Sequence, residues 1–347
     1  MTREIKFRYE LLNQNNSYLG TIDSISGSVA FNSLADNIKR TARFEIKENI
    51  FKDVDYLNDR IRPIIILDDI EYEMGVFLIP SPTRIKRDGG IYREIEGYDV
   101  TQIILEDKIT DRHFIKKGTN YVNAITQIIN SANIHQFLMP NSSATLTRDR
   151  EFEIGTSKLR IANELLREIN YTSLWTDRHG FVRSGKYTLP NQKEIDFSYQ
   201  TGDKNELVIN DTLTEEVDLF NVPNVFVIVA TNAEDESLVS KYTNSNPASP
   251  TSTLRRKRNI VDYREVSDIA NNSVLDDYAK RIAYQASDVY SKISFETLIN
   301  PKHEYSNGIY LKDDKLGIDN KFIETSWEIE MQVGGRMTHH ARRVIMI

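Results

Sequence analysis

The stretch RPIIILDDIEYEMGVFLIPSPTR, from Arg62 to Arg84, has the pattern of two short strands joined by a bend. The adjacent carboxylates Asp68 and Asp69 form the bend, and Val76 and Leu78 alternate on the returning strand. Alternation with a period of two is typical of a strand with one buried face. The stretch therefore predicts a β-hairpin, which makes strands the basic element of the first part of the chain.

Similar short alternating runs surround this hairpin, at residues 5–11, 29–31 and 42–46. The stretch RDGGIYREIEGYD, from Arg87 to Asp99, adds a strong turn signal in its Asp-Gly-Gly sequence. Turns separate these runs about every eight to twelve residues, which is the spacing of a barrel or a sandwich. Residues 1–100 are therefore predicted to form one β domain.

The pattern changes after residue 100. GTNYVNAITQIINSANI (Gly118 to Ile134) and GTSKLRIANELLREINYTSLW (Gly155 to Trp175) both place apolar residues at helical spacing. Thr156 or Ser157 is the expected N-cap of the second helix. A short hairpin follows around His179, so residues 101–200 are predicted to be a small mixed α/β insert domain.

Strands return after residue 200, in NELVINDTLTEE and NVPNVFVIVAT. One amphipathic helix is expected over 273–290, with Ser273 as its N-cap. Strict alternation then runs from Ile323 to Val333. Residues 201–347 are therefore predicted to be a second β domain that carries this helix, and the fold class is mainly β with an α+β insert.

The composition restricts the function. The chain has 347 residues, 39% of them hydrophobic and 27% charged, with a net charge of −7 and no cysteine. Disulfides, thiolate zinc sites and cysteine nucleophiles are therefore excluded. A net acidic chain is poorly suited to general nucleic-acid binding. No apolar run approaches the length of a membrane span, and the first residues alternate charged and apolar side chains, so neither a span nor a signal peptide is expected.

No constellation for catalysis or metal binding is evident. The six histidines lack the i, i+4 spacing of helical zinc sites, and neither a nucleophile elbow nor a phosphate loop is present. We therefore expect no enzymatic activity, no metal site and no cofactor. Trp175 fits either a small core or a sugar-stacking platform, and the core is the commoner place for such a residue.

Taken in order along the chain, several stretches resemble one family. They are NIKRT (Asn37 to Thr41), LNDRIRPIIIL (Leu57 to Leu67), YEMGVFLIPSPTR (Tyr72 to Arg84), IEGYDVTQIILEDK (Ile95 to Lys108), the two helical stretches of the insert, LFNVPNVFVIV (Leu219 to Val229), NPASPTSTLRRKRNIVD (Asn246 to Asp262) and LDDYAKRIAYQASDVYSKISFET (Leu275 to Thr297). Their order is similar to that in the late-control D group, the baseplate or tail-tip hub proteins of tailed phages and phage-like particles. The resemblance spans nearly the whole chain and is strongest to hubs or minor tail proteins of phages of Gram-positive hosts.

The resemblance implies an architecture and a role. Such hubs carry two β-barrel domains similar to the tail-tube subunit, here 1–100 and 201–347, with smaller domains between and beside them. Three copies form a ring that adapts a sixfold tube to a threefold tip and lets DNA pass during ejection. The implied partners are two further copies of the chain, a tail-tube or distal tail protein, and a tip, spike or fibre protein. The implied location is the virion tail tip, after synthesis in the host cytoplasm.

The enzymatic extensions of longer hubs are not expected here, because the sequence stops soon after its last predicted strand. An alternative function is a host-receptor or carbohydrate-binding module of the tail tip. That alternative requires Trp175 and nearby tyrosines to lie exposed in a groove.

The basic run in NPASPTSTLRRKRNIVDY (Asn246 to Tyr263) comprises Arg255, Arg256, Lys257 and Arg258. Prolines and small hydroxyl residues before it predict a turn that bonds to its own backbone. These four cations either contact an acidic surface of a neighbouring chain, face the lumen of the ring, or lie on a solvated loop. We expect contacts between chains instead of DNA reading, because one loop supplies too few cations for tight phosphate binding.

Overall fold

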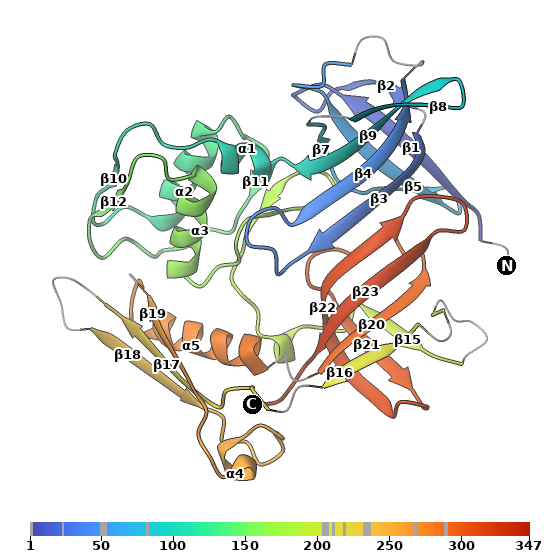
Figure 1. Ribbon diagram of the computed structural model, residues 1–347. Coiled ribbons are helices and arrows are strands. Elements are labelled where there is room, and N and C mark those ends of the chain that lie inside the picture. The colour runs from blue at the N-terminus through green and yellow to red at the C-terminus, as the bar shows by residue number, and fades with distance from the viewer. Residues whose placement is uncertain are drawn as a thin grey trace.

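The computed structural model describes residues 3–22, 24–48, 54–80, 83–202, 208–209, 212–217, 220–231, 237–266, 269–287 and 291–347. Strands dominate it, and most of the helical residues lie in a central insert and in one long helix (Figure 1). The predicted fold class, mainly β with an α+β insert, is confirmed. The domain boundaries at residues 100 and 200 remain a proposal.

The first group of strands occupies the region predicted to be β. It comprises β1 (Ile5–Leu12), β2 (Tyr18–Ile22), β3 (Ser24–Asn32), β4 (Arg40–Lys47), β5 (Arg60–Leu67), β6 (Ile70–Glu73), β7 (Phe77–Leu78), β8 (Thr83–Arg87) and β9 (Gly90–Asp99). The predicted hairpin is β5–β6, but its return begins at Ile70 and not at Val76. Asp68 and Asp69 both have positive φ, of 50° and 65°, so the turn has two residues and Leu67 pairs directly with Ile70.

The second group of strands continues the same sheet. It comprises β15 (Phe197–Gln200), β16 (Thr214–Val217), β20 (Ser291–Leu298), β21 (Gly308–Asp313), β22 (Ile318–Glu330) and β23 (Arg336–Arg343). The two groups meet where β22 pairs with β3, with Trp327 opposite Phe31, and Figure 1 shows these red and blue strands side by side. Among the described residues the main pairing path is open, from β16 at one end to β2 at the other. Two apolar cores lie along this sheet. One joins the first group to Trp327, Ile329 and Met337 of β22 and β23, and the other lies within the second group.

The insert has a third core of its own. Its elements are α1 (Thr101–Glu106), β10 (His113–Ile115), α2 (Tyr121–Ser131), β11 (Phe137–Leu138), β12 (Arg150–Phe152), α3 (Lys158–Glu168), β13 (Trp175–Thr176) and β14 (Val182–Arg183). The side chains of Asn120 and Ser157 accept hydrogen bonds from the first turns of α2 and α3, so of the two predicted caps, Thr156 and Ser157, the second caps α3. The short hairpin around His179 is present as β13–β14.

The part of the chain between β16 and β20 forms a separate lobe. It comprises β17 (Val225–Ala230), β18 (Leu238–Thr243), α4 (Thr253–Arg256), β19 (Val261–Val266) and α5 (Asn272–Ser287). The three strands form a sheet of their own, with α5 packed on one face. The helix predicted over 273–290 begins at Asn272, where Asn271 and not Ser273 accepts a hydrogen bond from the first turn. Residues 288–290 lie outside the described part of the chain.

Within the described residues, no helix combines the length and the apolar character that crossing a membrane requires.

The backbone just before β15 approaches the start of β21 closely at Gly308, and a substitution there tests this packing. A Cβ on Gly308 would overlap the backbone carbonyl oxygen of Glu194, which lies just before β15. We expect Gly308→Ala to separate β15 from β21 and to lower the free energy of unfolding by at least about 2 kcal/mol. The control is Gly185→Ala, whose Cβ would lie 3.8 Å from its nearest neighbour. Denaturant unfolding that finds the two variants equally stable would contradict this close packing.

Candidate functional site

Arg40, the first residue of β4, is completely buried and connects four segments of the chain. Its Nε donates to the carbonyl oxygen of Thr176 at 3.2 Å, and one terminal nitrogen donates to that of Met74 at 3.1 Å. The other terminal nitrogen lies 2.5 Å from a carboxylate oxygen of Glu304. The guanidinium also lies 5.0 Å from the ring centroid of Phe31. One side chain therefore holds the insert against both groups of strands.

Two carboxylates complete this junction. Asp99 is buried and accepts from the backbone nitrogen of Arg40 at 3.1 Å, from Thr176 Oγ1 at 3.0 Å and from the backbone nitrogen of Thr101 at 2.8 Å. Burial raises the pKa of Asp99, although these hydrogen bonds act in the opposite direction. Glu304 also accepts from Arg178 Nε at 2.8 Å, so it lies between two arginines. The junction is thus a connected polar network inside apolar surroundings.

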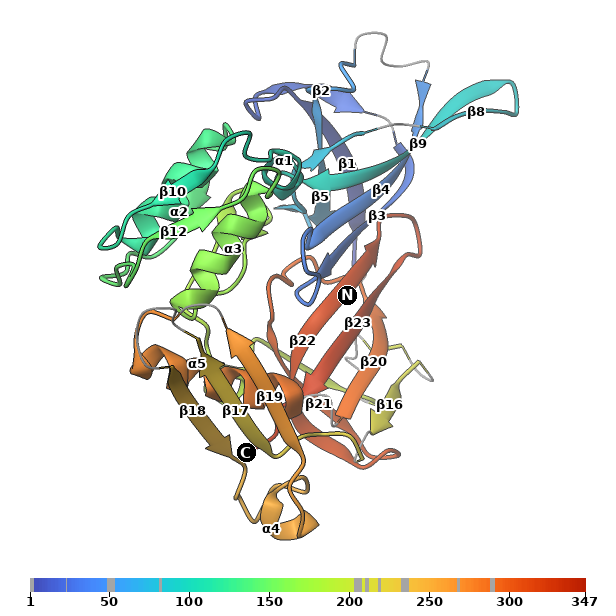
Figure 2. The same ribbon diagram turned by 60° about the vertical axis from the view of Figure 1, so that its left-hand side comes forward.

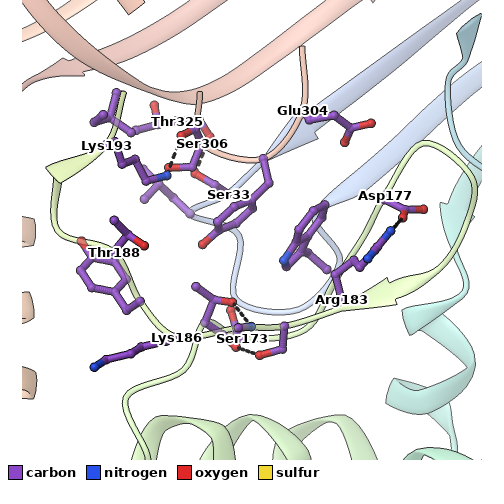
Figure 3. A pocket seen from close by; sticks show the side chains of 18 of the residues that line it. Ser33, Ser173, Asp177, Arg183, Lys186, Thr188, Lys193, Glu304, Ser306 and Thr325 are labelled. Carbon is purple, nitrogen blue, oxygen red and sulfur yellow. Dashed lines mark hydrogen bonds and ion pairs between the residues drawn. The ribbon is translucent and has the colours of Figure 1, made fainter. Parts of the chain in front are cut away.

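A cavity of about 860 Å³ opens beside this junction (Figure 3). Residues from the β3–β4 connection, the insert, α5 and the segment before β21 line it. Trp175 is half-buried on its wall, with Tyr305 stacked on it at 4.8 Å between ring centroids and Phe31 meeting it edge-on. Trp175 thus packs against the core of the first strand group and also faces the cavity. The packing of Trp175 therefore agrees with the core position that its sequence context favoured. Its contact with the cavity is an additional feature.

The fold brings together three titratable residues that local sequence spacing could not connect. His303, Glu324 and His339 are all buried, and their ligand-type atoms lie within 4.8 Å of one another. The Nδ1 atoms of His303 and His339 lie 2.7 and 2.6 Å from the two carboxylate oxygens of Glu324. The Nε2 atoms reach the hydroxyls of Tyr199 and Thr297, both at 2.8 Å.

These distances are those of hydrogen bonds. A tetrahedral zinc ion would hold neighbouring ligand atoms about 3.3 Å apart, because each bond is about 2.0 Å long. Every ring nitrogen of His303 and His339 also has a hydrogen-bond partner already. The cluster is therefore suited to sharing protons, through hydrogen bonds, between two imidazoles and one carboxylate. Burial lowers the pKa of His303 to about 3, lowers that of His339, and raises that of Glu324 to about 6.

The structure places the four candidate contact residues at the far end of the separate lobe, around α4, which projects from the rest of the molecule in Figure 2. Ser252 caps α4 by accepting from the backbone nitrogen of Arg255. Arg256 donates to the carbonyl oxygen of Val222 at 2.8 Å. Lys257 ends the helix with a positive φ of 51°, and the guanidinium of Arg258 lies over the ring of Phe220. Arg255, Lys257 and Arg258 are exposed, whereas Arg256 helps to hold the segment in place.

The strand β19 was not predicted. The residues around the basic run predict only a turn, but the following VDYREV forms an edge strand parallel to β17, between the basic run and α5. Its exposed Val261 and Tyr263 alternate with charged residues, which is a signal that the sequence did contain.

Neither a protein-family model nor a curated protein sequence matches the chain. Solved structures do share its fold. A tail protein from Neisseria meningitidis aligns over 97% of this chain and 96% of its own, with 12% identity and a TM-score of 0.69. A 43 kDa tail protein of prophage MuSo2 from Shewanella oneidensis aligns over 96% and 98%, with 10% identity and a TM-score of 0.68. The prophage tail protein gp18 from Listeria monocytogenes aligns over 96% and 94%, with 10% identity and a TM-score of 0.58. At these identities the likeness shows a common fold.

Replacing Arg40 tests the junction. We expect Arg40→Met to lower the free energy of unfolding by about 3–5 kcal/mol, because the buried carbonyl oxygens and Glu304 lose their cationic partner. Arg43 provides the matched control, since it lies on the same strand with its side chain 76% exposed. Arg43→Met should change stability by no more than about 0.5 kcal/mol. If denaturant unfolding showed that Arg40→Met and Arg43→Met lose the same stability, the buried network would contribute little to the free energy of unfolding.

The histidine–glutamate cluster makes stability depend on pH. Below about pH 6.5 the unfolded chain protonates His303 and His339, whereas the folded chain resists this because burial lowers their pKa values. The contribution of these neutral histidines to the free energy of unfolding is complete above that pH. It is lost as the pH falls towards about 3. Glu324 opposes the trend between about pH 6 and 4.5, where its raised pKa favours the folded chain. Two histidines outweigh one carboxylate, so the Tm should fall between pH 7 and pH 5.

The neighbouring histidine supplies the control for this pH effect. His340 follows His339 on β23 but is exposed. The slope of Tm against pH should become shallower in His339→Gln and stay unchanged in His340→Gln. A slope that is the same in wild type and His339→Gln would remove the cluster as its cause.

Proposed function

We propose that this chain is a structural protein of a phage or phage-like tail, and that it forms the trimeric hub of the baseplate or tail tip. The observation that carries the proposal is the fold similarity to a tail protein along 97% of the chain, at a TM-score of 0.69. Because a fold alone does not determine a function, the arrangement of the strands has to support the specific role.

The two groups of strands support a ring of three chains. The strands enclose two apolar cores, to both of which β22 and β23 contribute, and the β22–β3 pairing joins the two groups edge to edge in one sheet. Two tube-like units per chain match a sixfold tube if three chains close a ring, and closed rings are the usual way to satisfy a repeated interface. In this proposal the ring adapts the tube to a threefold tip and DNA passes through it during ejection. Its partners are a tube or distal tail protein above and a tip, spike or fibre protein below.

The lobe tip is the proposed contact between chains. Arg255, Lys257 and Arg258 are exposed there beside Leu254, which is 59% exposed, and Phe220, which is 71% exposed. Cations around exposed apolar side chains suit docking on an acidic surface, and a neighbouring copy has a net charge of −7.

The receptor-binding alternative is less well supported by the geometry. It needs Trp175 as an open platform, but Tyr305 stacks on the ring and Phe31 covers an edge. We also propose that the chain is not an enzyme, since the carboxylates of the Arg40 junction and of the histidine cluster, which are Asp99, Glu304 and Glu324, are all engaged in hydrogen bonds or ion pairs. The proposed location is the tail tip of the virion.

A reconstruction of the particle tip tests this function directly. The expected result is three copies of the chain in one ring, between the tube and the terminal structure. Six copies per ring, or density for the chain only at the periphery of the particle, would refute the hub. Purified protein alone is a weaker test, because a ring that assembles on the tube can dissociate at low concentration.

Neutralising the lobe tip should impair assembly without unfolding the chain. The variant Arg255→Gln with Lys257→Gln keeps Arg256 and its contact with Val222. We expect association with the tail to weaken by about tenfold, as for the loss of two partly buried ion pairs. The matched control is Lys116→Gln with Lys117→Gln, two adjacent exposed lysines of the insert. Normal assembly combined with loss of salt-sensitive duplex DNA binding would instead favour a DNA contact.

A further inference from the structure

The cavity beside Arg40 concentrates positive charge on an acidic chain. Two carboxylates and six arginines and lysines line it: Asp177, Glu304, Arg178, Arg183, Lys186, Lys193, Arg281 and Arg342. The whole chain, by comparison, has a net charge of −7. Cations that gather in a concave site focus the field and attract anionic groups.

Both carboxylates already have partners. Asp177 lies 2.5 Å from Arg183, and Glu304 pairs with Arg178 as well as with Arg40. Within the described part of the chain, the other four cations have no carboxylate partner at ion-pair distance. They are Lys186, Lys193, Arg281 and Arg342. The cavity therefore retains uncompensated positive charge.

Two of these cations are held in place by uncharged groups. Lys193 Nζ donates to the carbonyl oxygen of Ser306 at 2.6 Å, and Arg281 donates to that of Tyr171 at 2.9 Å. Burial lowers the pKa of Lys193 to about 8 although the charge of Asp196 raises it, and a further anion in the cavity would stabilise the charged form. Lys193 and Arg281 are thus pre-positioned, and Lys186 adds an exposed cation.

The shape and lining of the cavity indicate the kind of ligand. Leu34 and Leu138 line it and are each 49% exposed, so it offers apolar contacts as well as charge. A second hollow of about 310 Å³ shares Leu34, Thr325 and Arg342 with it and extends the groove to β16. Glu215 and Glu216 line its far end, where they contact Ser291 and Lys292, so the positive charge is confined to the part of the groove nearer Arg40. Figure 3 shows Lys186, Lys193 and Arg183 spread around the cavity, not converging on one point. An elongated, partly apolar groove with separated cations suits an extended chain better than a single small anion.

We propose that this groove binds an acidic peptide segment, carrying at least one apolar side chain, from a partner protein. The acidic groups of the segment pair with Lys186, Lys193 and Arg342, and its apolar side chain packs against Leu34 and Leu138. An acidic saccharide fits less well, because the aromatic rings on the wall each have one face occupied. Tyr305 stacks on Trp175, and the guanidinium of Arg281 lies 4.5 Å from the ring centroid of Tyr187. The binding depends on the groove alone and stands whether or not the chain is a tail hub.

The test uses the full chain and a fluorescent peptide of alternating Glu and Leu. Its companions are a peptide of alternating Lys and Leu and an oligogalacturonate as the acidic saccharide. The protein variants are Lys186→Gln with Arg342→Gln, and Leu34→Ser. Lys108→Gln with Lys116→Gln is the control, because both lysines are exposed and neither lines the groove or a hollow that adjoins it.

The acidic peptide should bind saturably to the wild type and to the control, with an affinity that falls as salt rises. Affinity should fall by about tenfold in the Lys186–Arg342 variant, as expected for two lost charge-assisted contacts, and also in Leu34→Ser. Absence of saturable binding, or equal affinity in all variants, would overturn the proposal. So would groove-dependent binding of the oligogalacturonate without binding of the peptide. Thermal unfolding of each variant separates lost binding from lost folding.

Discussion

The buried guanidinium of Arg40 is the interaction on which the arrangement of this molecule depends. A charged group that is fully removed from water costs several kcal/mol unless its surroundings replace the lost hydration. Here that replacement comes from distant parts of the chain: the carbonyl oxygens of Met74 and Thr176, and the carboxylate of Glu304. The arginine is satisfied only when all of these segments are in place, so its burial makes the relative placement of the insert and both strand groups one cooperative requirement.

The same requirement shapes the adjoining cavity. Glu304 and Asp177 are occupied by arginines, and this leaves the remaining lysines and arginines of the wall without internal carboxylates. The lobe tip presents cations differently, on a projecting turn where Arg256 is anchored and its neighbours are exposed. An acidic chain thus carries positive charge in two contrasting settings, one concave and rigid, the other convex. An acidic partner would bind the cavity by inserting a segment into it. An acidic partner of the lobe tip would instead dock on its surface.

Sequence patterns predicted what depends on neighbouring residues. The alternation from Ile323 to Val333 identified most of β22, which runs from Ile318 to Glu330 and leaves Val333 exposed beyond its end. The two hydroxyl residues before the second insert helix included its cap, Ser157. Patterns could not predict partners, because a period of two says which face is buried but not against which strand. The three-stranded sheet of the lobe therefore could not be told from the main sheet. Alternation does place Arg40 on the same face as Ala42 and Phe44, but it could not show which carbonyl and carboxylate oxygens surround the guanidinium there. His303 and His339 come together with Glu324 only through the pairing of β22 with β23 and the segment before β21.

The pairing of β22 with β3 also has a consequence for how the chain reaches its folded state. Trp327 and Phe31 are neighbours in the sheet although nearly the whole sequence separates them. As a polypeptide leaves the ribosome, β3 can pair with β4 early, but its other edge stays open until β22 has been synthesised. An open strand edge is a template for pairing with another chain, and long-range contacts of this kind form slowly. Nascent chains should therefore be most prone to aggregation just before the last strands emerge, and chaperone demand should be concentrated in that interval of synthesis.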